Sequence, residues 1–224
     1  MKTGFKILIA LTSLLPCQSG WAQGSFQNLD FENSIIVSSS PSGFGFNTGT
    51  ANVPGWTEYN GWNAANYSGG ATLVYNNMTL DAPGIELEGA DYFIPAIEGQ
   101  YSILISGGDT QSMQTGAAIG QTGTIPITAQ SLTFFLSYQY GNLQVSFNGQ
   151  PIDYLLTGST ASYNVYAADI SAFAGQTGQL LFNAPYYNRA LIDNIQFSTS
   201  PVPEPSAFAL TVLGTLVLTF RRRS

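Results

Sequence analysis

The 224-residue sequence predicts an all-β protein, an antiparallel β-sandwich or jelly roll, flanked by a signal peptide and a C-terminal transmembrane helix. Short β-branched and aromatic runs recur between polar turns, which is typical of strands. No heptads, long helical period or internal repeat accompany them. Each end of the chain carries an uncharged apolar run near basic residues. We therefore divide the chain into a signal peptide (1–22), a β-sandwich domain (23–200) and a C-terminal segment (201–224).

The N-terminus has the residue order of a secretory signal peptide. Lys2 and Lys6 precede an apolar run from Ile7 to Leu15, and the small residues Gly20 and Ala22 follow. This order predicts cleavage before the next residue and export of the rest of the chain. An uncleaved anchor helix is the alternative, but the run is short against the roughly 20 apolar residues that a spanning helix needs.

The only cysteine, Cys17, allows a lipoprotein interpretation, which Pro16 disfavours because a lipidation motif needs a small flexible residue there. Without the signal peptide the chain has neither Cys nor His. Disulfides, thiolate or imidazole metal sites and histidine-based nucleophilic catalysis are therefore excluded from residues 23–200.

Residues 23–200 are acidic. They contain twelve acids and a single base, Arg189, because every other Lys or Arg lies at one of the two ends. Nucleic-acid binding depends on Lys and Arg that neutralise phosphates. We therefore expect no nucleic-acid partner.

The C-terminal segment joins a Pro-Glu-Pro triplet to an apolar run and an arginine cluster. The prolines keep the junction extended and delay the helix. Residues 206–220 would form a helix of roughly 22 Å, short for a bilayer core of about 30 Å, although local thinning can cover the mismatch. The arginines would stay cytoplasmic by the positive-inside rule. The residues of this motif are Pro203, Glu204, Pro205, Arg221, Arg222 and Arg223.

The string VPEPS, then an apolar helix, then a terminal RRR, resembles the PEP-CTERM sorting signal of Gram-negative bacteria. The resemblance implies that an exosortase, a membrane-embedded transpeptidase, recognises the triplet and removes the anchor. It further implies a precursor anchored in the inner membrane, followed by export to the cell surface or an extracellular polysaccharide matrix. A plain C-terminal membrane anchor is the alternative interpretation.

Strand signals follow one another along the central domain. Tyr101–Ser106 and Leu132–Tyr140 are β-branched and aromatic runs bounded by turn residues. Asn148-Gly149 interrupts an alternating pattern and predicts a hairpin with a type I′ turn, because both residues tolerate positive φ. The strings SYNVYAADI, GQLLFNA and ALIDNIQFS continue the pattern, which favours an antiparallel sandwich.

The last strand signal places an acid among apolar residues. Leu191, Asp193, Ile195 and Phe197 share one face by period two. An acid at such a position is costly unless hydrogen bonds or a cation satisfy it. Near the start, NLDFEN alternates apolar and acidic residues and predicts the first strand.

NLDFEN and LIDNIQFS, with VPGWTEY, resemble parts of galactose-binding-like jelly rolls, the scaffold of many carbohydrate-binding modules. The resemblance implies a structural Ca²⁺ between the first and last strands, with Glu32 and Asp193 as the matching acids. Because Ca²⁺ takes about six to eight oxygen ligands, backbone carbonyls would have to supply most of them. The alternative is that Asp193 caps a turn through backbone amides and Glu32 is solvated.

A pair of carboxylates is the one catalytic arrangement that the composition leaves open. Glu86 and Glu88 would share a strand face, and Glu58 and Asp91 could join them. We interpret Glu86 and Glu88 as a solvated strand face and expect a protein that is not an enzyme.

Aromatic residues predict sugar binding, because flat rings stack on the apolar face of a pyranose. GWTEYNGWNAANYSGG places aromatic residues among amides and glycines in an expected loop. We expect Trp56 in the core, and Tyr59, Trp62 and Tyr67 as the ligand-binding residues. The string YYNR before the last strand forms a second cluster with a weaker case.

Together these patterns predict an exported, non-enzymatic surface or matrix protein whose jelly roll associates with polysaccharide. The expected partners are an exosortase, extracellular polysaccharide and, before processing, the membrane. A purely structural, self-associating exoprotein is the first alternative. A glycan-cleaving enzyme that uses Glu86 or Glu88 is the second.

Overall fold

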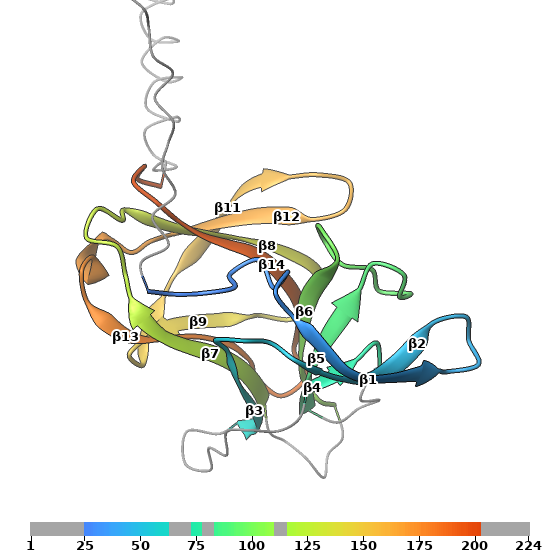
Figure 1. Cartoon of the computed structure of the whole chain (residues 1–224). Helices are drawn as coiled ribbons and strands as arrows, with labels where there is room; N and C mark the ends of the chain where they lie inside the picture. The colour runs from blue at the N-terminus through green and yellow to red at the C-terminus, as the bar shows by residue number, and fades with distance from the viewer. Residues whose placement is uncertain (1–24, 63–72, 78–82, 110–115, 203–224) are drawn as a thin grey trace, which may run out of the picture.

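The computed structural model describes residues 25–62, 73–77, 83–109 and 116–202, with the backbone alone for 60–62. These residues form two β-sheets and a single short 3₁₀ helix, Ser171–Phe173 (Figure 1). No helix in the described part of the chain is long and apolar enough to cross a membrane. The predicted signal peptide and the apolar C-terminal run lie outside the described residues.

The larger sheet has nine strands. Neighbouring strands are antiparallel except for one parallel pair, β4 and β5. Their spatial order is β1 (Ile35–Pro41), β2 (Asn47–Asn52), β4 (Leu73–Tyr75), β5 (Pro83–Gly89), β6 (Tyr101–Gly107), β14 (Arg189–Ser198), β8 (Ser131–Tyr140), β12 (Asn164–Asp169) and β11 (Tyr154–Ser159).

The smaller sheet has five strands, all antiparallel to their neighbours. Ile103 and Ile105 of the larger sheet share the main core with Ile119 and Phe182 of the smaller one. The predicted all-β class, with two largely antiparallel sheets, is therefore confirmed. The strand order is β10 (Gln150–Ile152), β9 (Gln144–Phe147), β13 (Thr177–Ala184), β7 (Gly116–Thr124) and β3 (Thr57–Trp62).

Several elements lie where their local pattern predicts them. β6 and β8 cover the two apolar runs that indicated strands. Asn148 and Gly149, between β9 and β10, have φ angles of 50° and 75°, both positive as a type I′ turn requires. Trp56 is buried, as expected, and its Nε1 donates a hydrogen bond to the carbonyl oxygen of Asn28 at 2.9 Å.

The first predicted strand, NLDFEN, is instead a series of turns. Asn28 and Phe31 have φ angles of 50° and 60°, which a strand does not accommodate. The alternation of burial still holds, since Leu29 and Phe31 are buried and Asp30 is exposed. The Leu29 carbonyl accepts a hydrogen bond from the Ile195 N–H at 2.9 Å, so this segment does lie beside the last strand.

One prediction about β14 is wrong, namely that the same face carries Leu191, Asp193, Ile195 and Phe197. Beyond Asp193 the pairing of β14 with β8 slips, and Asn194 takes a φ of 48°. The slip turns Ile195 and Phe197 into the main core, whereas Leu191 belongs to a separate apolar cluster on the outer face. Asp193 precedes the slip and therefore lies on the outer face with Leu191.

The segment that follows β5 covers part of the outer face of the larger sheet. Tyr92 and Ile94 of this segment pack against Leu104 and Leu191. We refer to residues 90–100 as the cover segment. It gives the larger sheet apolar contacts on both of its faces.

The interpretation of Glu86 and Glu88 as a solvated strand face is wrong. Ile85 and Leu87 of β5 face the main core, so the two acids between and beyond them face outward. Their exposed fractions are nevertheless 1% and 0%. Glu86 lies opposite Leu104 in the ladder, and the cover segment packs on Leu104. The local alternation predicts the outward face but not the segment that returns over it.

A third acid, Glu58 of β3, lies between the two sheets. It pairs with Ile119, whose side chain belongs to the main core, and opposed residues point to the same face. Burial raises the pKa of Glu58 to about 7. The folded protein therefore holds this proton at a pH at which the unfolded chain has released it.

We predict that the free energy of unfolding decreases as pH rises from about 4 to 8, because the unfolded chain ionises first. Glu58→Gln keeps the shape of the side chain and removes its titration. It should reduce the decrease by roughly 1–3 kcal/mol. Urea unfolding of the full chain across this pH range measures both curves. A variant curve parallel to that of the wild type would contradict the prediction.

Candidate functional site

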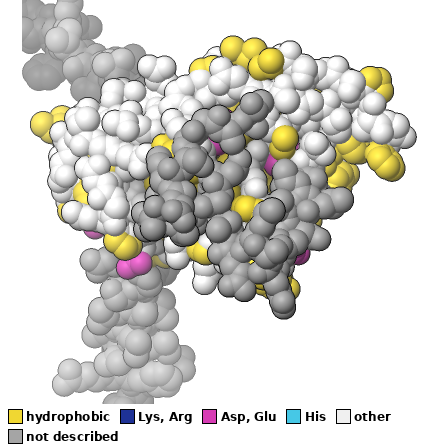
Figure 2. All heavy atoms as spheres, turned by 90° about the horizontal axis from the view of Figure 1, so that it is seen from below, with side chains coloured by type: hydrophobic (Ala, Val, Ile, Leu, Met, Phe, Trp, Pro, Cys, Tyr) yellow, Lys and Arg dark blue, Asp and Glu magenta, His cyan; other side chains and the backbone are white. Residues whose placement is uncertain are grey.

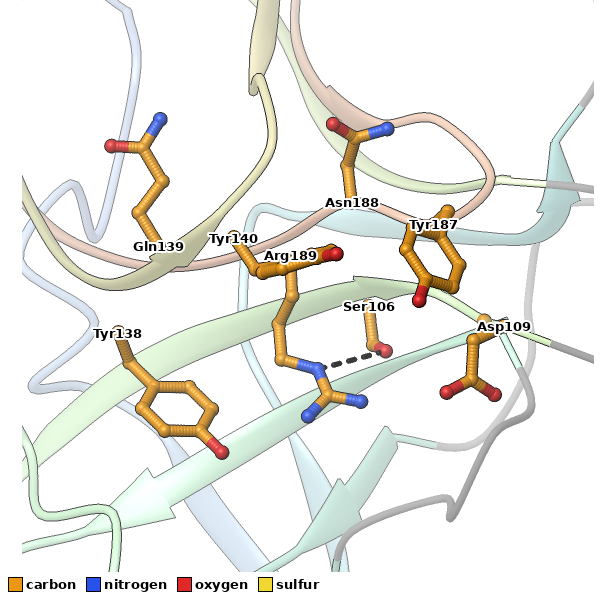
Figure 3. Close-up of a pocket in the computed structure, with 9 residues that line it drawn as sticks. Ser106, Asp109, Tyr138, Gln139, Tyr140, Tyr187, Asn188 and Arg189 are labelled. Carbon is orange, nitrogen blue, oxygen red and sulfur yellow. Dashed lines mark hydrogen bonds between the residues drawn. The ribbon is translucent and has the colours of Figure 1, made fainter.

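A groove of about 490 Å³ opens in the larger sheet where β6 and β8 end and β14 begins. Because β14 is antiparallel to both neighbours, its first residue, Arg189, pairs with Ser106 of β6 and with Tyr140 of β8. Figure 3 shows the side chains that these strand ends and the turn before β14 bring together. We call this site the tyrosine groove.

Three exposed tyrosines line the groove. The exposed fractions of Tyr138, Tyr140 and Tyr187 are 47%, 59% and 52%. The rings of Tyr140 and Tyr187 meet edge to face, with centroids 5.3 Å apart. A side-chain hydrogen bond with Tyr187 raises the pKa of the Tyr140 phenol. The groove thus presents aromatic surface to solvent. Most large apolar side chains of the described residues are, in contrast, buried.

Two of these tyrosines have strained backbones. Tyr138 and Tyr187 have φ angles of 46° and 65°, a region that costs residues other than glycine about 1–3 kcal/mol. Tyr187 is the third residue of a turn closed by the Asn188 N–H and the Pro185 carbonyl at 3.0 Å, where type II turns ordinarily carry glycine. Tyr138 lies at a slip between β8 and β14. The strained backbone thus occurs at two residues whose side chains line the groove.

Asn188 holds the rim of the groove together. Its Oδ1 accepts a hydrogen bond from the Asn142 N–H, and its Nδ2 donates to the Tyr186 carbonyl at 2.8 Å. Its own carbonyl accepts from the Gly107 N–H at 2.8 Å. These bonds connect the ends of β6 and β8 to the turn before β14. The groove is therefore preformed.

Arg189 is the only Lys or Arg among the described residues. Its Nε donates to the Ser106 Oγ at 3.3 Å, and its guanidinium carbon lies 5.9 Å from the centroid of the Tyr138 ring. Figure 3 shows the guanidinium and the Asp109 carboxylate at the groove on different elements. The site therefore combines one cation, one acid and several rings.

A smaller hollow of about 270 Å³ adjoins the tyrosine groove on the same outer face. The two share Tyr138, and the cover segment contributes Phe93 and Ile97 to the smaller one. Tyr138 therefore stands between two neighbouring depressions, an arrangement that offers room to more than one ring of an extended ligand.

Of the three predicted ligand-binding residues, the structure describes the side chain of Tyr59 alone, and Tyr59 does not line the tyrosine groove. Tyr59 lies in β3 with an exposed fraction of 5%, and its hydroxyl accepts a hydrogen bond from the Gln179 Nε2 at 3.1 Å. Trp62 is the last residue of β3, and its side chain lies outside what the structure describes. Tyr67 lies wholly outside the described residues. The YYNR string, in contrast, contributes Tyr187, Asn188 and Arg189 to the groove.

Glu32 and Asp193, the acids matched to a calcium site, line one hollow of about 260 Å³. Glu32 accepts two successive backbone N–H groups at 2.9 and 3.1 Å. Asp193 accepts the Ser102 hydroxyl at 2.7 Å and the Glu98 N–H at 3.1 Å. Burial raises the pKa of Asp193 to about 7, against these hydrogen bonds. Oxygens of both carboxylates thus already accept hydrogen bonds from the protein. The calcium site stays a prediction.

The three buried glutamates lie in two separate places, and none of them lines the tyrosine groove. Glu58 lies between the sheets, whereas Glu86 and Glu88 lie on the outer face of β5. Burial, and secondarily the neighbouring Glu86, raises the pKa of Glu88 well above its ordinary value. Burial thus favours the neutral form of Glu88 and keeps its carboxyl away from solvent.

Comparison with models of known protein families finds no match, and comparison with curated proteins also finds none. The function is therefore argued from the site and the two ends of the chain.

The calcium hypothesis predicts a stabilising effect of the ion. Adding Ca²⁺ at about 100 times its dissociation constant to the chelator-treated full chain should stabilise it by about 2.7 kcal/mol. Asp193→Asn should abolish this gain, while Asp153→Asn, at an acid outside the hollow, should retain it. Melting curves with and without the ion measure the effect. A wild-type curve unmoved by Ca²⁺ would reject the hypothesis.

Proposed function

We propose that this chain is an exported bacterial surface or extracellular-matrix protein, sorted and processed by an exosortase. Its galactose-binding-like jelly roll binds polysaccharide and does not cleave it. The observation that carries the binding proposal is the tyrosine groove, in which three exposed rings and Arg189 converge at preformed strand ends.

The groove has the chemistry that a sugar requires. A pyranose offers apolar C–H faces, which rings cover, and an edge of hydroxyl groups, which need donors and acceptors. Here the tyrosines supply rings, while Gln139 supplies an amide group and Asp109 a carboxylate group. Binding sites commonly combine apolar walls with a few placed polar groups in this way. The bonds of Asn188 reduce the ordering that binding would otherwise have to impose.

The surface supports a partner rich in hydroxyl groups. The face in Figure 2 is mainly uncharged, with scattered apolar side chains and few acids among its described residues. Such a surface solvates through amide, hydroxyl and backbone groups, and hydrated polysaccharide offers matching groups. The proposed address rests on the signal-like N-terminus and on the Pro-Glu-Pro, apolar and arginine order of the C-terminal segment.

A purely structural, self-associating exoprotein is the second candidate. Exposed aromatic side chains around the β1–β2 hairpin favour self-association. Phe44 and Phe93 are exposed, and their ring centroids lie 6.2 and 6.4 Å from that of Phe46. This candidate needs no ligand at the tyrosine groove. Binding experiments on that groove therefore separate the two functions.

We expect Tyr187→Asn to weaken polysaccharide binding by about tenfold or more, because it removes one wall of the groove. Asparagine tolerates the left-handed backbone of this position, so the melting temperature should not fall. Affinity electrophoresis and a glycan array, with the full chain in detergent, measure binding. Phe44→Asn is the matched control, since it removes an exposed ring outside the groove. Equal binding by both variants and the wild type would contradict the proposal.

The proposed sorting route predicts two cuts. Mass spectrometry of the protein from its producing cells should find an N-terminus at Gln23 and a C-terminus that lacks the apolar run. Replacing Pro203, Glu204 and Pro205 with alanine should leave an uncut precursor in the inner membrane. The uncut wild-type chain in the cytosol would refute the route.

A further inference from the structure

We propose that the tyrosine groove selects a sugar that carries a carboxylate, a uronic acid, and that Arg189 binds this carboxylate through its Nη groups. The inference rests on the proposed polysaccharide binding and names the class of sugar that the groove takes.

The guanidinium of Arg189 has donors that the protein does not use. Of its five N–H groups, the Nε–H is bonded to Ser106. This is the one hydrogen bond of the guanidinium to the described residues. The planar fork of the two Nη groups matches the two oxygens of a carboxylate, and such bidentate pairs are roughly twice as strong as neutral hydrogen bonds.

The position of this charge is the second argument. The single base of residues 23–200 stands among twelve acids, yet in the described structure it forms no ion pair with any of them. Arg189 is also half-buried, so it has lost part of its hydration. A partly dehydrated cation with no anionic partner among the described residues is unfavourable, and an incoming anion relieves that cost.

Neighbouring residues orient the guanidinium of Arg189 at the groove. The Ser106 hydroxyl holds the Nε side, and the ring of Tyr138 lies within cation–π range of the guanidinium. Tyr138 also borders the adjoining hollow. A uronate on Arg189 would therefore have its next sugar beside that hollow.

Asp109 and the other acids of residues 23–200 limit how densely the ligand can carry negative charge. Asp109 lines the same groove, where a carboxylate accepts sugar hydroxyls and repels a second anion. The excess of acids elsewhere repels a dense polyanion. The geometry therefore favours a polysaccharide in which uronates are separated by neutral sugars over a continuous polyuronate.

The test pairs one change in the protein with one in the ligand. Glucuronoxylan is compared with the same polymer after its carboxylates are reduced to alcohols, and the full-length wild type with Arg189→Gln. We expect the reduction and the substitution each to weaken binding about tenfold or more. Combined, they should weaken it no further, because both remove the same contact. Polygalacturonate should bind more weakly than glucuronoxylan.

The outcomes separate the inference from the function on which it rests. If the wild type binds native and reduced polymer equally, or neutral polysaccharides alone, the uronate inference is overturned and polysaccharide binding stands. If it binds no polysaccharide, both fail. Equal binding of dextran sulfate would overturn carboxylate selection. The comparison of polymers on the wild type needs no variant, so it holds even if Arg189→Gln does not fold.

Discussion

The arrangement of this protein depends on the two-sided pairing of β14. This strand bonds to β6 along one edge and to β8 along the other, and its side chains pack into the main core on one face and into the smaller apolar cluster on the other. Two slips against β8 decide which side chains face which way. The first leaves Tyr138 and Arg189 around the groove. The second turns Ile195 and Phe197 into the core and leaves Asp193 outside.

The outer face depends on the same strand. Asp193 and Ser102 bind the backbone N–H groups of Glu98 and Ile97, so two buried polar side chains hold the end of the cover segment. That segment packs on Leu104, which lies opposite Glu86 of β5, and it forms one wall of the hollow beside the groove. An acid expected to be costly in a core thus serves as an acceptor for a loop that would otherwise have unpaired N–H groups.

Features that depend on a few neighbouring residues are predicted from the sequence. Features that depend on pairing between distant segments are not. Runs of β-branched and aromatic residues locate β6 and β8, and Asn148-Gly149 locates a hairpin, because each signal acts over a few residues. A period of two does not reveal the slip at Asn194. Asparagine tolerates the left-handed region, yet many asparagines never enter it.

The groove shows the same limit. YYNR is visible as an aromatic cluster beside the only base of residues 23–200, and three of its residues line the tyrosine groove. Tyr138 and Tyr140 are read from sequence only as the end of a strand. They join the site because β8 lies beside β14, a pairing between segments about fifty residues apart that no local pattern specifies. Conversely, Tyr59 is expected on a loop, but β3 continues through it and buries its ring.

The two ends of β14 also give the domain a direction. The groove lies at its first residue, and the described chain ends shortly after its last, a rise of roughly 30 Å for a strand of this length. Phe26 packs against Phe197 at 5.2 Å, so the start of the domain lies at the same end as the exit. If the C-terminal segment anchors the precursor as proposed, the groove therefore lies at the end of the domain opposite the anchor. Under the proposed polysaccharide binding, polymer crowded at a surface would meet the groove at high local concentration, so that modest affinity per site would suffice to retain the protein.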